Sequence, residues 1–249
     1  MSHTTLQQFL PAIQTLNTDR PLTKQDLLTT SFLMENDGDI SMYYAPHNEW
    51  VNHNARIVII GITPGWNQMK IAVEQFVKSF SSGEALETCL KEAKRAAGFA
   101  GSMRKNLIDM LDQCSIPEKL NISDSSHLFG KQRNLLHTTS VIKYPVFNDG
   151  KNYTGHQPPI HQSPLLHHYA YQEFPNELAN IAPPALVIPL GKTVEHVIFG
   201  LAKENKLPEH NYLTGFPHPS GANGHRVKQF LQQKEQLQKK IRIWGTKLD

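Results

Sequence analysis

The most distinctive feature of the hydrophobic pattern is an unbroken β-branched run from Ile57 to Ile60. A strand covered by helices on both faces has no polar side, so this run predicts a buried strand of a parallel sheet. The run ends at Gly61-Ile-Thr-Pro-Gly65, where two glycines and a proline form a tight loop. Open α/β sheets place ligands at such carboxyl ends, although an ordinary strand-to-helix turn has the same pattern.

Apolar residues at helical spacing alternate with further strand-like runs along the chain. Helices are predicted over residues 69–80, 84–97, 102–111, 163–181, 191–202 and 223–240. Further strands are predicted over residues 135–146, 185–190 and 212–216, and residues 241–244 as a closing strand or a tail. Residues 147–162 are predicted to be a long irregular connection. Strands separated by helices indicate an α/β fold with a parallel sheet and helices on both faces.

The domain organisation follows from the absence of an internal repeat, a low-complexity linker or a shift in composition. We therefore expect residues 1–249 to form a single domain. Residues 1–50 are predicted to be a helical N-terminal extension packed on it, because apolar residues recur there at helical spacing.

Composition narrows the class of protein. Hydrophobic residues make up 39% and charged residues 19%, which is typical of a soluble globular chain. No apolar run approaches the roughly 20 residues of a membrane span, and residues 1–16 lack the pattern of a signal peptide. We expect a cytoplasmic protein without membrane contact, and a monomer. The net charge of +3 permits nucleic-acid binding through a local patch but does not argue for it.

Metal and nucleotide motifs are weak in this chain. Two cysteines, Cys89 and Cys114, cannot supply a four-thiolate site. The histidines match no zinc spacing, so we expect neither a metal nor a cofactor. Gly191-Lys-Thr193 lacks the earlier glycine of a phosphate loop, because position 186 is Leu. Lys192 is then either a solvated lysine at a helix start or a contact to one phosphate of a polyanion.

A second unusual stretch is Phe216-Pro-His-Pro-Ser-Gly221. Two prolines restrict the backbone around His218 at the end of a predicted strand. Ser220 and Gly221 are predicted to open the following helix, so backbone amides would face this loop. A histidine placed there can donate a hydrogen bond to a developing anion, although a structural histidine in a proline-rich turn is the alternative.

Five segments, in order, resemble motifs of the uracil-DNA glycosylase superfamily over roughly residues 55–240. They are Gly61-Ile-Thr-Pro-Gly65, Phe99-Ala-Gly101, Thr139-Ser-Val-Ile-Lys143, Pro184-Ala-Leu-Val-Ile-Pro-Leu-Gly191 and His218-Pro-Ser-Gly221. Their counterparts are the Gly-x-x-Pro-Gly loop, a Phe-x-Gly segment, two strands of the iron–sulfur class, and the His-Pro-Ser motif. The resemblance implies a three-layer α/β/α sandwich with a central, mostly parallel four-stranded sheet.

The chain departs from that family at three features. The four cysteines of the iron–sulfur class are absent. Thr63 stands where the loop often carries Asp, Glu or Asn, and Ser140 stands where an Asn usually reads the uracil edge. A threonine hydroxyl can position water but is a poor base, and a serine hydroxyl cannot match the pattern that an amide offers to a base edge.

The resemblance also implies roles for individual residues in hydrolysis of the bond between a flipped base and deoxyribose. The catalytic residues would be His218, which stabilises the departing anion, and Thr63, which assists a water held by the main chain. The residues implied to contact the base are Ile62, Gly65, Trp66, Phe99 and Ser140. Those implied to contact DNA are Lys192, Thr193, Ser220, Gly221, Ala222, Asn223 and Arg226. The implied partner is damaged or uracil-containing DNA.

Two other functions remain open on the sequence. One is a catalytically impaired nucleic-acid-binding protein of the same fold, for which Thr63 and Ser140 argue. The other is an N-glycosidase acting on a small nucleoside or nucleotide, which the modest net charge permits. Duplex affinity and its salt dependence distinguish the last from the first two.

Overall fold

The β-branched run forms the strand β3 (Ile57–Gly61), as predicted, and all five of its residues are buried. The computed structural model describes residues 4–182 and 184–246 of the chain. β3 pairs in parallel with β4 (Leu136–Ser140) on one edge and with β7 (Leu186–Pro189) on the other. A strand enclosed in this way needs no polar position, which explains its composition.

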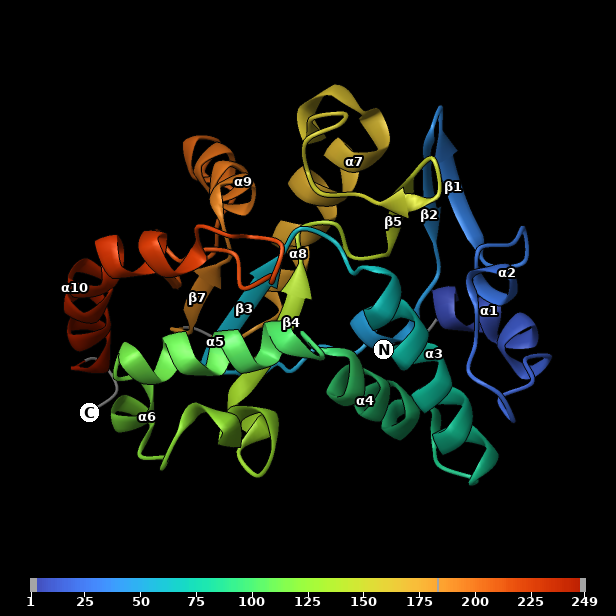
Figure 1. Cartoon of the computed structure of the whole chain (residues 1–249), viewed down its shortest axis with the longest axis horizontal. Coiled ribbons are helices and arrows are strands. Elements are labelled where there is room, and N and C mark those ends of the chain that lie inside the picture. The colour runs from blue at the N-terminus through green and yellow to red at the C-terminus, as the bar shows by residue number, and fades with distance from the viewer. Residues whose placement is uncertain (1–3, 183, 247–249) are drawn as a thin grey trace. The chain divides into compact units, whose positions relative to one another are not determined.

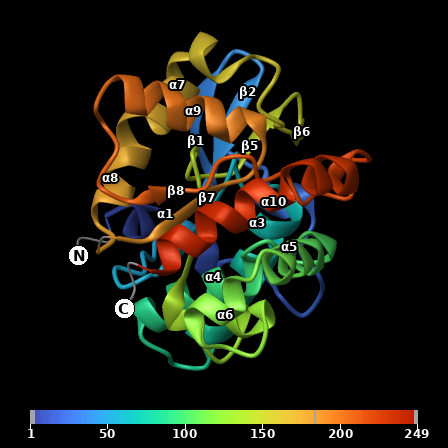
Figure 2. The same cartoon turned by 90° about the vertical axis from the view of Figure 1, so that its left-hand side faces the viewer.

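β7 also pairs in parallel with the two-residue strand β8 (Asn211–Tyr212), which completes a parallel sheet in the order β4-β3-β7-β8. Figure 2 shows α9 (Lys192–Lys203) on one side of this sheet, and α5 (Ser102–Gln113) with α6 (Ile116–Leu120) on the other. The predicted α/β fold with a parallel four-stranded sheet and helices on both faces is confirmed.

A second, antiparallel sheet was not predicted. Its strands, in spatial order, are β1 (Leu33–Asp37), β2 (Ile40–Tyr43), β5 (Val146–Asn148) and β6 (Lys151–Asn152). The helical description of residues 1–50 was therefore incomplete, because a β-hairpin follows α1 (Thr4–Gln14) and α2 (Lys24–Leu27). The irregular description of residues 147–162 was wrong at its start, where a second hairpin forms.

The contacts group the chain into two compact units, each assembled from three separate segments. Unit 1 contains the residues up to Val51, Thr63–Ala100 and Ile142–Gln172, and it includes the antiparallel sheet. Unit 2 contains Asn52–Ile62, Gly101–Val141 and the residues from Glu173 onward, and it includes the parallel sheet. The N-terminal 50 residues thus belong to a unit that draws on later parts of the chain, whereas the single-domain organisation stays a prediction.

The remaining helices follow the apolar spacing closely. They are α3 (Trp66–Ser81), α4 (Leu86–Ala97), α7 (Pro164–His168), α8 (Phe174–Ala179) and α10 (Arg226–Gly245), with a π-helical turn (Tyr169–Glu173) between α7 and α8. Single 3₁₀ turns occur at Pro46–Asn48, Ser125–Phe129, Arg133–Leu135 and Ile160–Gln162. Figure 1 labels these helices along the chain. No helix in the described ranges is both long and apolar enough to cross a membrane.

Several predicted boundaries were wrong, among them the strand predicted over residues 212–216, which is the two-residue strand β8 ending at Tyr212. β4 ends at Ser140 rather than near Val146, and Val146 begins a strand of the other sheet. α10 begins at Arg226 rather than near Ser220, and its last turn includes Ile241–Trp244, predicted as a strand or tail. Ile241 and Trp244 are buried three residues apart, which is helical rather than strand spacing.

Candidate functional site

The carboxyl ends of three parallel strands lie level with one another in unit 2. Gly61 of β3 is opposite Ser140 of β4 in the sheet register. The Leu190 N–H, just beyond β7, donates to the Ile60 carbonyl at 2.9 Å. Ser140 and the loops that follow β3 and β7 therefore begin at the same edge of the sheet, where open α/β sheets bind ligands.

Gly191 connects the loop that contains His218, residues 216–221, to this edge of the sheet. Its N–H donates to the Phe216 carbonyl at 2.8 Å, and its φ of +83° is a conformation that favours glycine. A Cβ on Gly191 would lie only 3.2 Å from the Cβ of His218. The close approach of His218 to the end of β7 therefore depends on a residue without a side chain.

His218 is held in one tautomer by its own loop. Its Nδ1 accepts a hydrogen bond from the Ser220 N–H at 3.3 Å, so the proton of the neutral ring lies on Nε2. Burial lowers the pKa of His218, which keeps the ring neutral at pH 7. No group in the described part of the chain accepts a hydrogen bond from this Nε2–H, which leaves a donor for a ligand.

The segment after His218 is a hydrogen-bonded loop rather than the first turn of α10. Asn223 Nδ2 donates to the His218 carbonyl at 3.2 Å, and Arg226 Nη1 donates to the Ser220 carbonyl at 3.2 Å. Asn106 of α5 donates from Nδ2 to the Pro219 carbonyl at 2.9 Å. The expected helix N-terminus at Ser220 was wrong, and side chains on α5 and α10 fix the loop instead.

The first motif crosses from unit 2 into unit 1 between Ile62 and Thr63. The Thr63 hydroxyl donates to the Tyr144 carbonyl at 2.7 Å and accepts from the Val146 N–H at 3.2 Å. The hydroxyl proton is therefore used in a hydrogen bond to the backbone, and only the remaining lone pair of the oxygen is available to a water molecule. This bonding makes Thr63 a structural link between the loop and β5.

Trp66 is the first residue of α3 and lies beside an unexpected partner. Its N–H donates to Oδ1 of Asn152, on the hairpin strand β6, at 2.9 Å. The Asn152 amide also lies over Gly65, since its Nδ2 would be 3.5 Å from a Cβ there. Sequence reasoning did not find Asn152, because a lone asparagine near a turn carries no catalytic signal.

Phe99 has a strained backbone for a bulky residue, with φ at +50°. Its side chain is only 5% exposed, in unit 1 directly after α4. Positive φ at such a residue persists only where the surroundings enforce it, and this kind of strain clusters at functional sites.

The structure divides the predicted site residues between the two units. Unit 2 contains Ile62, Ser140, Lys192, Thr193, His218, Ser220, Gly221, Ala222, Asn223 and Arg226, and unit 1 contains Thr63, Gly65, Trp66 and Phe99. Ser140 is buried, whereas Lys192, Gly221 and Ala222 are exposed. The exposed members are accessible to a macromolecule, and Ser140 is not.

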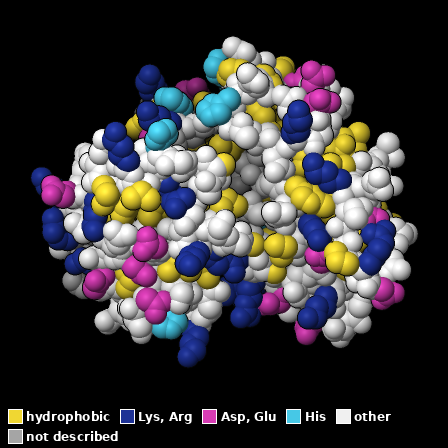
Figure 3. Space-filling view, in the orientation of Figure 1, with side chains coloured by type: hydrophobic (Ala, Val, Ile, Leu, Met, Phe, Trp, Pro, Cys, Tyr) yellow, Lys and Arg dark blue, Asp and Glu magenta, His cyan; other side chains and the backbone are white. Residues whose placement is uncertain are grey.

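Charge is dispersed over the face of the molecule shown in Figure 3. Lysine and arginine side chains on this face are interspersed with acidic and uncharged ones. This pattern agrees with the net charge of +3. On this face, binding to a polyanion would depend on local contacts rather than on one continuous basic field.

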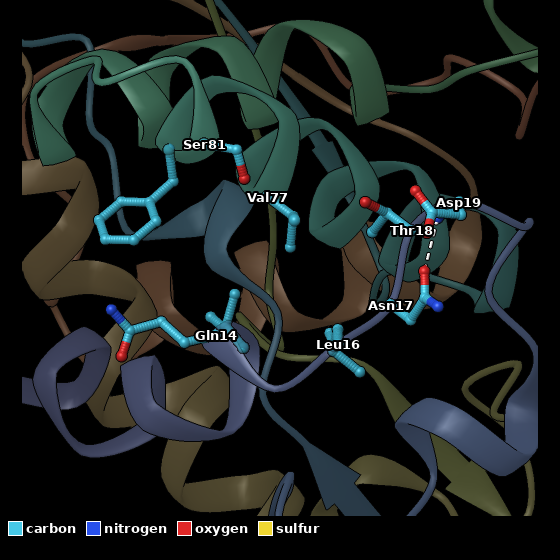
Figure 4. A pocket seen from close by; sticks show the side chains of 9 residues that line it. Gln14, Leu16, Asn17, Thr18, Asp19, Val77 and Ser81 are labelled. Atoms are coloured by element: carbon cyan, nitrogen blue, oxygen red, sulfur yellow. Dashed lines mark hydrogen bonds between the residues drawn. The ribbon is translucent and has the colours of Figure 1, made fainter.

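A hollow in unit 1 contains none of the predicted site residues. Its volume is about 460 Å³, and it lies between the end of α1 with the following turn and the end of α3. Figure 4 shows its mixed polar and apolar lining, in which Asn17 Oδ1 accepts from the Asp19 N–H. Among the residues that the structure describes, no group of three potential metal ligands is found.

Comparison with known proteins identifies the family of this chain. A family model described as the uracil DNA glycosylase superfamily matches residues 49–242, and the chain therefore belongs to that superfamily. The chain is also 51% identical over 228 residues to "Uncharacterized protein YoxB" of Bacillus subtilis (strain 168). That alignment covers 92% of this chain and 89% of the relative, whose name assigns no activity.

Proposed function

We propose that this protein is a monofunctional DNA glycosylase that hydrolyses the N-glycosidic bond of a flipped uracil or another damaged base. The observation that carries the proposal is His218, a neutral histidine with its tautomer fixed by Ser220 and its Nε2–H left for a ligand. Superfamily membership supports the reaction class, and the superfamily's DNA substrate supports the partner.

The proposed role of His218 is to stabilise the leaving group. When the bond between C1′ and the base nitrogen breaks, both electrons leave with the base, which becomes an anion. The His218 Nε2–H would donate to a carbonyl oxygen of that base, where much of the negative charge resides. A preorganised donor of this kind is worth about 10²–10³-fold in rate. A water molecule then supplies its oxygen to C1′, and its released proton balances the charge of the base.

The attacking water has no carboxylate in the first loop to activate it. We propose that the main chain of Ile62 and Thr63 holds this water, with the Thr63 hydroxyl contributing only a lone pair because its proton is bonded to Tyr144. A positively charged sugar reacts with a weak nucleophile, so a strong base is not required. This assignment makes leaving-group stabilisation the main source of catalysis.

The remaining roles concern recognition of DNA. Phe99 would stack on the flipped base, a contact worth about 1–3 kcal/mol, and Trp66 would help to exclude bulkier bases. Lys192, Thr193 and Arg226 would contact phosphates. The segment Ser220–Asn223, which is exposed at Gly221 and Ala222, would face the strand that the base has left. Ala222 is small, so the wedge that keeps the base out of the stack would be weak.

The test is release of uracil from a duplex that contains one uracil, with alkali used to cut each abasic site. We expect cleavage by the wild-type protein and loss of at least about 10²-fold in rate with His218→Ala. His225→Ala is the matched control, because His225 is exposed on the same loop and no role is assigned to it. Equal loss in both variants, or full activity of His218→Ala, would contradict the role of His218.

A second function is favoured by two observations. The hydroxyl proton of Thr63 is hydrogen-bonded to the Tyr144 carbonyl, and Ser140 is buried and has a short side chain. A protein of this fold could therefore bind damaged DNA without cleaving it. Absence of cleavage on uracil, hypoxanthine and xanthine substrates, with retained and salt-sensitive duplex binding, would establish this alternative. Absence of both cleavage and duplex binding would favour a small-nucleoside N-glycosidase.

A further inference from the structure

The residue Asn152 stands at the end of a hairpin with a well-defined turn. Asp149 and Gly150 have φ values of +47° and +68°, and Asn148 pairs with Lys151 across them. Two consecutive residues of positive φ are typical of a two-residue hairpin loop whose twist matches its strands. Asn152 pairs with Phe147 and is the last residue of the returning strand, β6.

This hairpin is fixed to the rest of unit 1 at several points. The Asp149 N–H donates to the Asp39 carbonyl at 3.1 Å, in the turn of the other hairpin. Asn148 Nδ2 donates to the Gln157 carbonyl at 2.7 Å, and Lys24 Nζ donates to the Gly150 carbonyl at 2.9 Å. The position of Asn152 is therefore set by sheet pairing and by three further hydrogen bonds near the turn.

The amide orientation of Asn152 is fixed by the start of α3. The Trp66 N–H is one of the first N–H groups of that helix, which have no partner within the helix. Because this N–H needs an acceptor, Asn152 directs Oδ1 toward it, at 2.9 Å. A flipped amide would bring Nδ2 against the N–H, two donors facing each other, so the flip is disfavoured.

The other end of the amide is consequently a pure donor. Asn152 is exposed, and within the described ranges its Nδ2 has no hydrogen-bond partner. The whole amide lies over Gly65, with Nδ2, Cγ and Oδ1 at 3.5–3.7 Å from the position of a Cβ there. A side chain larger than alanine at position 65 would occupy the place of this amide.

We propose, on the basis of the proposed glycosylase function, that Asn152 is the residue that reads the edge of the flipped base. Its Nδ2 donates to a carbonyl oxygen, so it selects bases whose exocyclic amine has been replaced by oxygen, such as uracil, hypoxanthine and xanthine. Cytosine and adenine present an amine there, and two donors would face each other. The role rests on the contacts of Asn152 within unit 1, where its amide lies beside Gly65 and the first residue of α3.

The test compares the affinity of the protein for two DNA duplexes that carry uracil or cytosine at the same position. The opposite position holds an abasic analogue, so that neither base loses a base pair on flipping. Affinity is measured by fluorescence anisotropy with 2′-fluoro nucleotides, which resist cleavage because fluorine disfavours positive charge at C1′. Excision of the ordinary nucleotides is measured in parallel. In Asn152→Asp the carboxylate still accepts from the Trp66 N–H, but its second oxygen repels a carbonyl and accepts from an amine.

We expect wild-type protein to prefer uracil and Asn152→Asp to lower the uracil-to-cytosine affinity ratio by about tenfold or more. Asn205→Asp is the control, because it makes the same chemical change at an exposed turn where Asp tolerates the positive φ. An unchanged ratio in folded Asn152→Asp, or no preference in the wild type, would overturn the assignment. If the uracil-to-cytosine affinity ratio depends on Asn152 but no base is excised, the result would refute the proposed glycosylase activity and leave the role of Asn152 in recognition intact.

Discussion

Two histidines of unit 2 share a local geometry and differ in what they face. His218 Nδ1 accepts from the Ser220 N–H, and His137 Nδ1 accepts from the Asn52 N–H, both at 3.3 Å. His137 is completely buried on β4, and its Nε2–H donates to Glu177 Oε1 at 2.9 Å. The Nε2–H of His218 has no acceptor in the described part of the chain.

The tautomer alone does not distinguish the two histidines. Both rings carry their proton on Nε2 because a backbone N–H occupies Nδ1. In His137 the remaining donor is satisfied within the core, so the side chain contributes to stability. In His218 the Nε2–H has no partner among the described residues, and the proposed mechanism uses it as the donor to the departing base.

The largest expected effect is on stability at His137. His137→Ala removes a fully buried ring and leaves the Asn52 N–H without this acceptor and Glu177 without this donor. We expect the free energy of unfolding to fall by about 2–4 kcal/mol, measured by urea denaturation. Excision per folded molecule should be unchanged. Loss of excision with normal stability would break the distinction between the two histidines.

A smaller effect is expected from Gly191→Ala, which tests how closely His218 must be placed. The new Cβ would lie 3.2 Å from the Cβ of His218 and would displace the imidazole. We expect kcat/KM to fall by about 10–100-fold. Gly38→Ala is the control, since Gly38 has a similar φ of +61° but open space around it. An equal loss of activity in both variants would indicate general strain rather than displacement of His218.

The smallest effect concerns pH. Burial lowers the pKa of His218 below the ordinary value of about 6.5. Protonation would also place a hydrogen on Nδ1, against the Ser220 N–H. We therefore expect kcat/KM to stay level as the pH falls from about 8 through about 6.5 and to decline only below that. Circular dichroism at each pH separates this decline from unfolding. A decline that begins above the ordinary histidine pKa would contradict a neutral, desolvated His218.

The parallel sheet could be predicted because its determinants are local. The apolar run of β3 and the residues after it signal a buried strand and a loop without any knowledge of the partners. His218 could be selected as a candidate site residue because prolines on both sides make its segment unlike an ordinary loop. The extent of α10 was misjudged at both ends, because the amphipathic pattern is weak in so polar a helix.

The second sheet and Asn152 could not be predicted in the same way. Residues 135–146 form one continuous strand-like pattern, and nothing local indicates that β4 and β5 join different sheets. The Asp149-Gly150 pair is a local signal of a two-residue hairpin turn, but it does not indicate which sheet the hairpin joins. The contact of Asn152 with Trp66 joins residues 86 positions apart, so it depends on tertiary structure alone.

The enclosure of β3 also has a consequence for synthesis of the chain. β3 emerges from the ribosome early, but β7 and β8, which complete its sheet, end near residues 189 and 212. At about 5–20 residues per second, roughly 6–26 s pass between translation of β3 and of β7, its second partner. During that time a fully apolar strand has at least one unpaired edge, a combination that favours aggregation. The yield of native protein in cells should therefore depend on chaperones that bind nascent chains.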